Sequence, residues 1–190
     1  MKKRCSWPGE SPLYIDYHDH EWGIPIHDER LLFEFICLEG QQAGLSWITV
    51  LKKREHYRKA FKNFEPIKVA RMKDETIEKL LLDTNLIRNR LKLYSIRNNA
   101  KAFLAIQAEF GTFDHYIWSF VKGNTIQNRW KTLKQTPTKT TESDAMAKDL
   151  KKRGFKFIGS TICYAFMQAA GMVNDHVLTC YRHEQLDPSK

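Results

Sequence analysis

Apolar residues recur at intervals of three and four along most of the chain, the spacing that gives an α-helix one buried face. The clearest run covers residues 29–39, and we expect this helix to end at Gly40 because glycine commonly follows the last helical residue. Its apolar positions are Leu31, Leu32, Phe35, Ile36 and Leu38. No segment alternates apolar and polar residues with the period of two typical of a half-buried strand. The pattern therefore predicts an all-α fold.

Residues that favour helix starts place further elements. Pro66 suits the first position of a short helix because its missing N–H removes no helical hydrogen bond there. Asp74 and Ser143 are each expected to cap a helix, since their side-chain oxygens can accept from free backbone N–H groups. The longest predicted helix spans residues 91–108. Other helices are expected near residues 45–51, 114–121 and 161–170.

Residues 122–141 interrupt the helical pattern. They are polar and rich in Thr, Asn and Gln, which predicts one long loop. The 190 residues suffice for one domain with its own core, so we expect a single domain over residues 1–190. This domain is either one compact unit or two packed helical lobes on either side of the loop. Residues 1–12 have a basic start without an apolar stretch after it, so we do not expect a secretory signal, and no run approaches the ~18 apolar residues that span a membrane. We expect a cytoplasmic protein, without a membrane partner, that is a monomer.

Charge adds a candidate partner. The formal net charge is +9 and the sequence pI is about 9.4, which favours a polyanion. Nucleic acid is the first candidate, because each Lys or Arg that neutralises a phosphate releases a counterion, and an anionic membrane is the second. Many basic proteins are only solvated, so charge alone leaves the partner open.

A basic hairpin between two predicted helices fits DNA. Its candidate contacts are Lys152, Arg153, Gly154, Lys156, Gly159 and Ser160. Phe155 or Ile158 can pack between the helices, and Ser160 can cap the second one, whose N–H groups would then face a phosphate. An ordinary corner with solvated lysines has the same residues. Residues 143–171 resemble the helix-hairpin-helix motif of DNA-repair glycosylases.

The resemblance to that superfamily has one departure. A catalytic Asp commonly follows the motif there, just before or near a His, and Asn174 stands where we would expect it. The departure argues against a lyase reaction and directs attention to another carboxylate.

Three stretches are more specific than composition. They are residues 14–23 (YIDYHDHEWG), residues 38–47 (LEGQQAGLSW) and residues 174–177 (NDHV). In this order they resemble the 3-methyladenine DNA glycosylase I family, the constitutive alkylation-repair glycosylases of bacteria. The resemblance runs from about Cys5 to Cys180 and leaves the last ten residues without a counterpart.

The resemblance implies a site and a reaction. Glu39 would contact the edge of a flipped, cationic base, where it either activates water or only binds the base. Tyr17 and Trp47 would stack on the base, with Trp7, Tyr14 and Trp22 as walls. The expected reaction is hydrolysis of the N-glycosidic bond of 3-methyladenine in double-stranded alkylated DNA, which releases the free base and leaves an abasic site without strand cleavage. Taken alone, Glu39 also fits a solvated acid at a helix end, and each aromatic residue fits core packing.

The cysteines raise a metal question. The resemblance implies that Cys5, His18, His176 and Cys180 are zinc ligands, a closed tetrahedral set that joins the two ends of the chain for structure rather than catalysis. His176 and Cys180 are four residues apart, which would place them on one face of a helical turn. Spacing by itself leaves His20, His27 and His183 equally available. Cys37 and Cys163 lie in apolar stretches and are expected in the core.

Two other functions share some of these features. A zinc-stabilised DNA-binding module without chemistry would have the same charge and hairpin, but it would not need an aromatic pocket beside Glu39. A zinc hydrolase acting on nucleobases would need a His-x-Glu sequence followed by Cys-x-x-Cys. Residues 18–21 read His-Asp-His-Glu with no such cysteine pair downstream, so we disfavour it.

Overall fold

The structure is a computed structural model, and it describes residues 2–187. The longer helices are α1 (Pro12–His20), α2 (Glu29–Gln42), α7 (Arg90–Phe110), α9 (Thr141–Lys152) and α10 (Ser160–Ala169). The shorter ones are α3 (Trp47–Leu51), α4 (Arg54–Ala60), α5 (Pro66–Ala70), α6 (Asp74–Leu80), α8 (Phe113–Trp118) and α11 (Tyr181–Gln185). Turns of 3-10 helix form η1 (Lys62–Phe64), η2 (Ser119–Val121) and η3 (Leu133–Gln135). The helical prediction is confirmed in the main.

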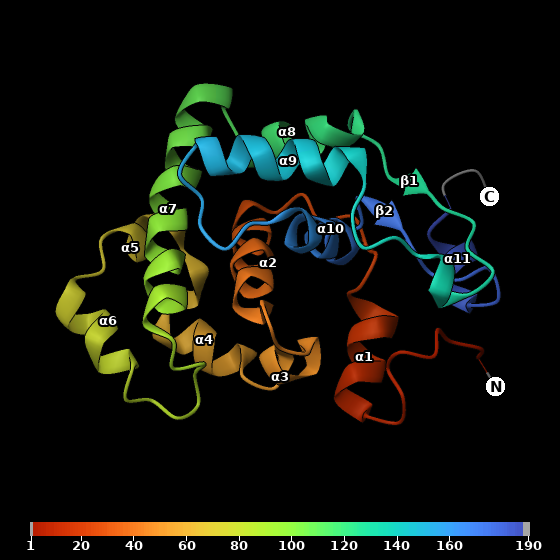
Figure 1. Cartoon of the computed structure of the whole chain (residues 1–190), viewed down its shortest axis with the longest axis horizontal. Helices are drawn as coiled ribbons and strands as arrows, with labels where there is room; N and C mark the ends of the chain where they lie inside the picture. The colour runs from red at the N-terminus through yellow and green to blue at the C-terminus, as the bar shows by residue number, and fades with distance from the viewer. Residues whose placement is uncertain (1, 188–190) are drawn as a thin grey trace.

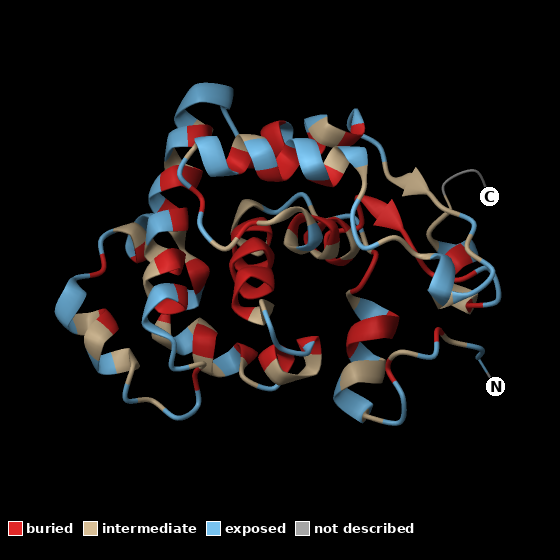
Figure 2. Cartoon of the chain, viewed as in Figure 1, coloured by how far each residue is buried: buried red, intermediate tan, exposed pale blue. Residues whose placement is uncertain are grey.

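Helix α2 is the centre of the molecule (Figures 1 and 2). Ten consecutive residues, 32–41, are buried, so the helix has no solvent-facing side over most of its length. It packs on α3, α7, α8 and α10. Buried apolar residues on both sides of the 122–141 segment belong to one contiguous cluster. No helix within residues 2–187 is both long and apolar enough to cross a bilayer.

The predicted end of α2 at Gly40 is wrong, because the helix continues to Gln42. A Cβ atom on Gly40 would lie 3.3 Å from the carbonyl oxygen of Phe157 in the hairpin. The glycine therefore serves close packing of the hairpin against α2 rather than helix termination.

Two predicted caps are displaced by one or more residues. Asp74 is the first residue of α6, and Lys73 occupies the cap position. Thr140 caps α9, where its side chain accepts from the Ser143 N–H, and the Ser143 hydroxyl in turn accepts from the Thr140 N–H. This reciprocal pair is a capping box, in which Ser143 has the second role. Pro66 is the first residue of α5, as predicted.

The polar segment 122–141 is mainly loop, although its last residue, Thr141, already begins α9. It contains η3, and it contributes β1 (Ile126–Gln127), which pairs in parallel with β2 (Val173–Asn174). This two-residue pair departs from the all-α prediction. It holds the loop beside the segment that leads to α11 (Figure 1).

Candidate active site and metal centre

A pocket of about 270 Å³ lies among α1, α2, α10 and the loop that contains η3. The five aromatic residues predicted to surround the base all line it: Trp7, Tyr14, Tyr17, Trp22 and Trp47. The rings of Tyr17 and Trp47 have centroids 5.5 Å apart and are tilted by 45°. The rings of Trp7 and Tyr14 meet edge-on, with their centroids 4.7 Å apart. The sequence-predicted aromatic residues therefore gather at one cavity.

Glu39 also lines this pocket, from within α2. Glu39 is only 3% exposed, so the alternative of a solvated acid at a helix end is wrong. Burial raises the pKa of the Glu39 carboxyl to about 8, because the charged form loses its hydration. Its Oε2 atom is buried without a hydrogen-bond partner in the described part of the chain.

Unpartnered polar atoms concentrate at the pocket. In residues 2–187, six buried side-chain nitrogen or oxygen atoms lack a partner, and four of them belong to pocket-lining residues. These four are Trp7 Nε1, Glu39 Oε2, Trp47 Nε1 and Thr136 Oγ1. Buried polar groups in folded proteins are nearly always hydrogen-bonded. Two N–H donors, a carboxyl oxygen and a hydroxyl are thus left for a polar ligand with a flat, apolar body.

Sequence reasoning missed half of the lining. The missed residues are Gln42, Leu133, Thr136, Ala165, Gln168 and Asp175. Gln42 follows Glu39 by three residues on the same helix, and that spacing was a usable signal. Leu133 and Thr136 lie in a loop, where no periodicity indicates which side chains face inward.

Asp175, rather than Asn174, is the polar residue that β2 and its flank present to the pocket. The Asp175 carboxylate accepts hydrogen bonds from Asn128 Nδ2 (2.7 Å), Trp130 Nε1 (2.7 Å), Tyr164 Oη (2.7 Å) and Gln168 Nε2 (2.8 Å). It thereby ties the loop before η3 to α10. Asn174 instead donates to the side chain of Gln127 and the carbonyl of His183.

A buried ion-pair network holds α1 against α2. Arg54 donates to Glu21, just after α1, at 2.5 Å and to the fully buried Glu34 of α2 at 2.6 Å. Arg58 donates to the same Glu34 carboxylate. Because buried charges are stable only when paired, this network fixes the helix carrying Tyr17 relative to the helix carrying Glu39.

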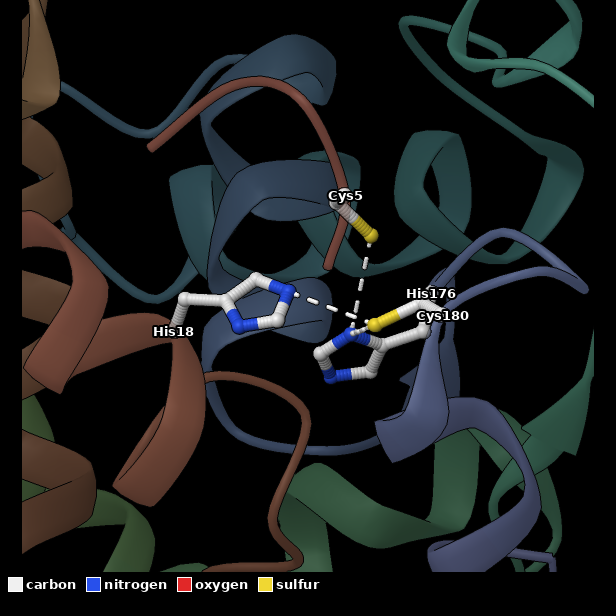
Figure 3. Close-up of side chains that lie close together, drawn as sticks. All are labelled: Cys5, His18, His176 and Cys180. Carbon is white, nitrogen blue, oxygen red and sulfur yellow. Dashed lines mark hydrogen bonds between the residues drawn. The ribbon is translucent and has the colours of Figure 1, made fainter. Parts of the chain in front are cut away.

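Figure 3 shows the four predicted metal ligands side by side. One ligand atom from each of Cys5, His18, His176 and Cys180 lies within 4.8 Å of the others, and all four residues are buried. Cys180 Sγ is 3.5 Å from His18 Nε2 and 3.4 Å from His176 Nδ1. The predicted helical turn for the last pair is wrong: His176 directly precedes a turn in which the Cys180 N–H donates to the Val177 carbonyl, and α11 begins only afterwards.

The imidazole rings are oriented for a metal. His18 Nδ1 contacts Asp19 Oδ1 at 2.8 Å, and His176 Nε2 contacts the Trp22 carbonyl at 3.1 Å. Such partners fix which nitrogen faces the ion. The Arg4 guanidinium keeps the pKa of Asp19 below its usual range, so this partner stays anionic.

The protonation states suit a metal as well. Burial lowers the pKa of His176 and thereby favours its neutral form. The hydrogen bond from the Cys5 thiol lowers the pKa of Cys180. Two sulfur and two imidazole ligands around one point fit a closed tetrahedral zinc site.

The other two cysteines are core residues, as predicted. Cys37 and Cys163 are at most 1% exposed, and burial raises the pKa of Cys163 to about 12.

The hairpin joins α9 to α10 with Phe155 and Ile158 both buried. Gly159, not Ser160, occupies the cap position of α10, and no side chain within residues 2–187 caps this end. Asn99 of α7 holds the hairpin: it accepts from the Lys156 N–H at 2.8 Å and donates to the Lys156 carbonyl at 3.2 Å. Lys156 itself is exposed.

The hairpin cations differ in their freedom. Lys152 is exposed, whereas the Arg153 guanidinium already donates to Glu109 at 2.6 Å and to Asp149 at 2.7 Å. Of the predicted DNA contacts, Arg153 is therefore the one whose charge is neutralised within the chain.

Comparison with known proteins gives concordant matches. The sequence profile of the methyladenine glycosylase family matches residues 7–183. DNA-3-methyladenine glycosylase 1 of Escherichia coli (strain K12) is 55% identical over 178 residues, which cover 94% of this chain and 95% of that protein.

Solved structures agree with the sequence matches. A crystal structure of 3-methyladenine DNA glycosylase I superposes with a TM-score of 0.92 at 56% identity, covering 94% of this chain and 98% of that chain. A variant of a 3-methyladenine DNA glycosylase I in complex with 3-methyladenine superposes with a TM-score of 0.91 at 38% identity, over 94% and 96% of the two chains.

Proposed function

The chain belongs to the methyladenine glycosylase family, as three sequence stretches predicted, and we propose that it hydrolyses the N-glycosidic bond of 3-methyladenine in double-stranded alkylated DNA. The products are free 3-methyladenine and an abasic site. The observation that carries this proposal is the pocket, which five aromatic residues line and whose lining residues carry four polar atoms without partners in the described part of the chain.

The pocket suits a flipped purine in shape and polarity. Tyr17 and Trp47 supply aromatic faces for stacking, and stacking of one base on such a face is worth roughly 1–3 kcal/mol. The adenine edge presents an exocyclic amine between ring nitrogens that accept hydrogen bonds. Glu39 Oε2 can accept from the amine, while the indole N–H groups of Trp7 and Trp47 can donate.

Glu39 responds to the charge of the lesion. With only the groups of the protein around it, its pKa of about 8 keeps the carboxyl mostly neutral at neutral pH. A methylated, cationic base beside it would lower that pKa and favour the carboxylate, which in turn stabilises the cation. The same carboxylate can accept a proton from an attacking water, so both roles remain assigned to Glu39.

The hairpin would hold the DNA backbone as a helix-hairpin-helix motif. The uncapped start of α10, together with the exposed Lys152 and Lys156, offers donors and positive charge to a phosphate. Such contacts position the duplex without reading its sequence. Among residues 2–187, the side chains that line the pocket include no lysine that could act as a lyase nucleophile, in keeping with a hydrolase.

A single zinc ion bound by Cys5, His18, His176 and Cys180 would join the N-terminal segment to the C-terminal turn. A closed set of four protein ligands leaves no position for water or substrate, so the ion would act in stability.

Release of free 3-methyladenine from alkylated duplex DNA tests the function directly. Wild type should release the base and leave the strand uncut until the abasic site is cleaved by alkali. Glu39→Ala and Glu39→Gln should be compared with it at equal folded fraction. Undiminished excision by both variants would remove Glu39 from the reaction.

A DNA-binding module without chemistry is distinguished by the pocket. Titration with free 3-methyladenine should quench tryptophan fluorescence in wild type and much less in Trp47→Phe. A chain that binds DNA yet shows neither quenching nor base release would favour the module.

A further inference from the structure

The loop before α9 concentrates positive charge. Residues 122–141 contain five cationic residues and no acidic one, while the net charge of the entire chain is +9. The five are Lys122, Arg129, Lys131, Lys134 and Lys139. More than half of the excess charge therefore falls on about a tenth of the chain.

The last four of these cations are unneutralised. Arg129, Lys131, Lys134 and Lys139 are exposed, and no carboxylate in residues 2–187 pairs with them. Arg153 of the hairpin, by contrast, is neutralised by Glu109 and Asp149. Hydrated lysines that pair with nothing internal are available to an external polyanion.

The same loop borders the pocket. Leu133 and Thr136 line the cavity from η3 and its end, so the cations flank residues that face the proposed base. The loop is also held in place. The Trp130 indole N–H donates to Asp175, and the Trp130 carbonyl accepts from the Leu178 N–H at 2.8 Å. The Asn128 carbonyl lies 2.7 Å from His183 Nε2.

Helix α10 relates this loop to the hairpin. The hairpin precedes the N-terminal end of α10, whereas Gln168, near the other end, shares the Asp175 carboxylate with the loop. Figure 1 shows the hairpin beside α7 and the loop beside α11, with α10 between them. Ten residues make α10 ~15 Å long, about the axial length of four base-pair steps. Ala165 and Gln168 line the pocket from this intervening stretch.

We propose that the loop of residues 128–139 is a second DNA-backbone contact surface, which holds phosphates across the pocket from the hairpin. This proposal rests on the proposed function, because it takes the pocket as the place where the lesion enters. Two backbone contacts on either side of an extruded nucleotide would keep the duplex fixed while the base leaves the stack. The loop lysines supply charge, and Leu133 and Thr136 of the same loop meet the base.

The test neutralises the loop without touching its anchors. The variant Lys131→Gln/Lys134→Gln/Lys139→Gln removes three exposed charges and leaves Asn128 and Trp130 intact. The matched control Lys68→Gln/Lys73→Gln/Lys79→Gln removes three exposed charges on and beside α5 and α6. Affinity for a duplex containing a stable abasic analogue is measured from 50 to 200 mM salt.

Each phosphate contact contributes about 0.9 to the slope of log affinity against log salt. The loop variant should lose about 1–3 from this slope and at least about tenfold in affinity at low salt, whereas the control should keep both. The unfolding temperature of the loop variant and its affinity for free 3-methyladenine should match those of wild type.

Binding of both variants to phosphatidylserine vesicles is measured as well. A loop variant whose salt slope for DNA equals that of the control overturns the proposal. A loop variant that loses binding to the vesicles but keeps its binding to DNA also overturns it.

Failure of this proposal is separable from failure of the proposed function. Wild type that releases 3-methyladenine, together with an unchanged slope in the loop variant, contradicts the loop alone. Wild type that releases no 3-methyladenine contradicts the function, whatever the slopes are.

Discussion

At the scale of single residues, Glu39 is the informative side chain. A carboxyl group in an aromatic pocket is unfavourable for the folded protein, because burial removes water from its charged form. Its Oε2 atom finds no partner to offset this among the described residues. Sites that bind a cation tolerate such an arrangement, since the ligand supplies the missing interaction.

The raised pKa of Glu39 predicts a pH-dependent stability. Between pH 4.5, its ordinary value, and about 8, the folded protein keeps a proton that the unfolded chain has lost. Folding stability therefore falls as the pH rises through this window, by up to about 1.4 kcal/mol per pH unit. Glu39→Gln carries no such proton. Denaturant unfolding should find it more stable relative to wild type at pH 8 than at pH 5.

The comparison of the two proteins isolates this group, because other titrations are common to both. A stability difference that stays constant from pH 5 to pH 8 would show that Glu39 is ionised at neutral pH in the folded protein.

Thr136 is a second residue whose role follows from an unmet hydrogen bond. Its buried hydroxyl borders the pocket without a partner in the described chain. Thr136→Val keeps the shape and removes the hydroxyl, so a hydrogen bond to the base worth about 0.5–1.5 kcal/mol would be lost. Affinity for free 3-methyladenine, measured by fluorescence titration, should fall about two- to tenfold.

Thr138 of the same loop provides the control for this substitution, since it is exposed and does not line the pocket. Thr138→Val should bind the base as wild type does. Equal affinities for all three proteins would mean that the Thr136 hydroxyl does not contact the base.

At the scale of elements, apolar periodicity predicted most helices but not where they end. Residues 90–110 form the longest helix, close to the predicted 91–108, because its buried stripe is continuous. The end of α2 was missed because Gly40 allows a close tertiary contact with Phe157, which the sequence around Gly40 does not reveal. The β1–β2 pair was missed for a similar reason: two residues are too few to show alternation, and the partner lies 47 positions away.

The position of the hairpin depends on one side chain of α7. Asn99 makes two hydrogen bonds with the backbone of Lys156, and it is 2% exposed. Asn99→Ala should leave both backbone groups unpaired, at a cost of about 1–3 kcal/mol in unfolding free energy. Because the hairpin would shift, DNA affinity should fall several-fold while free 3-methyladenine still binds.

A control for this prediction exists on the same helix. Gln107 also makes a tertiary hydrogen bond, but its partner is Glu29 of α2, at 2.6 Å, and not a backbone group of the hairpin. Gln107→Ala should lower stability and leave the DNA affinity of the folded protein unchanged. If both variants weaken DNA binding equally, the effect belongs to general destabilisation and not to the hairpin.

At the scale of the whole molecule, the candidate metal centre connects the ends of the chain to the pocket. The Tyr181 N–H donates to the Lys3 carbonyl at 2.9 Å, so the terminal segments already lie together. Two pocket-lining residues pack on the candidate metal-ligand rings. The ring centroids of Trp7 and His18 are 5.2 Å apart, and those of Trp22 and His176 are 4.6 Å apart. The sequence could supply the four ligands only through family resemblance, because the two halves are more than 150 residues apart.

This contact between ligands and pocket predicts a double effect of metal loss. Cys5→Ser/Cys180→Ser should contain no zinc, whereas wild type and the core control Cys37→Ala/Cys163→Ala should contain one ion per chain by elemental analysis. The unfolding temperature of the ligand variant should fall by about 10 °C, equivalent to roughly 3–4 kcal/mol for a chain of this size. A domain with its own core keeps folding, so the loss stays below the ~10–16 kcal/mol of zinc-finger peptides.

The second effect, on affinity for free 3-methyladenine, shows whether the metal only joins the ends of the chain or also holds the walls of the pocket in place. With His18 and His176 released, the walls formed by Trp7 and Trp22 lose the rings they pack against, and free 3-methyladenine should bind more weakly even at temperatures where the variant is fully folded. Wild-type affinity in a zinc-free, folded variant would mean that the metal joins the ends without shaping the site. Stoichiometric zinc in Cys5→Ser/Cys180→Ser would refute the ligand assignment itself.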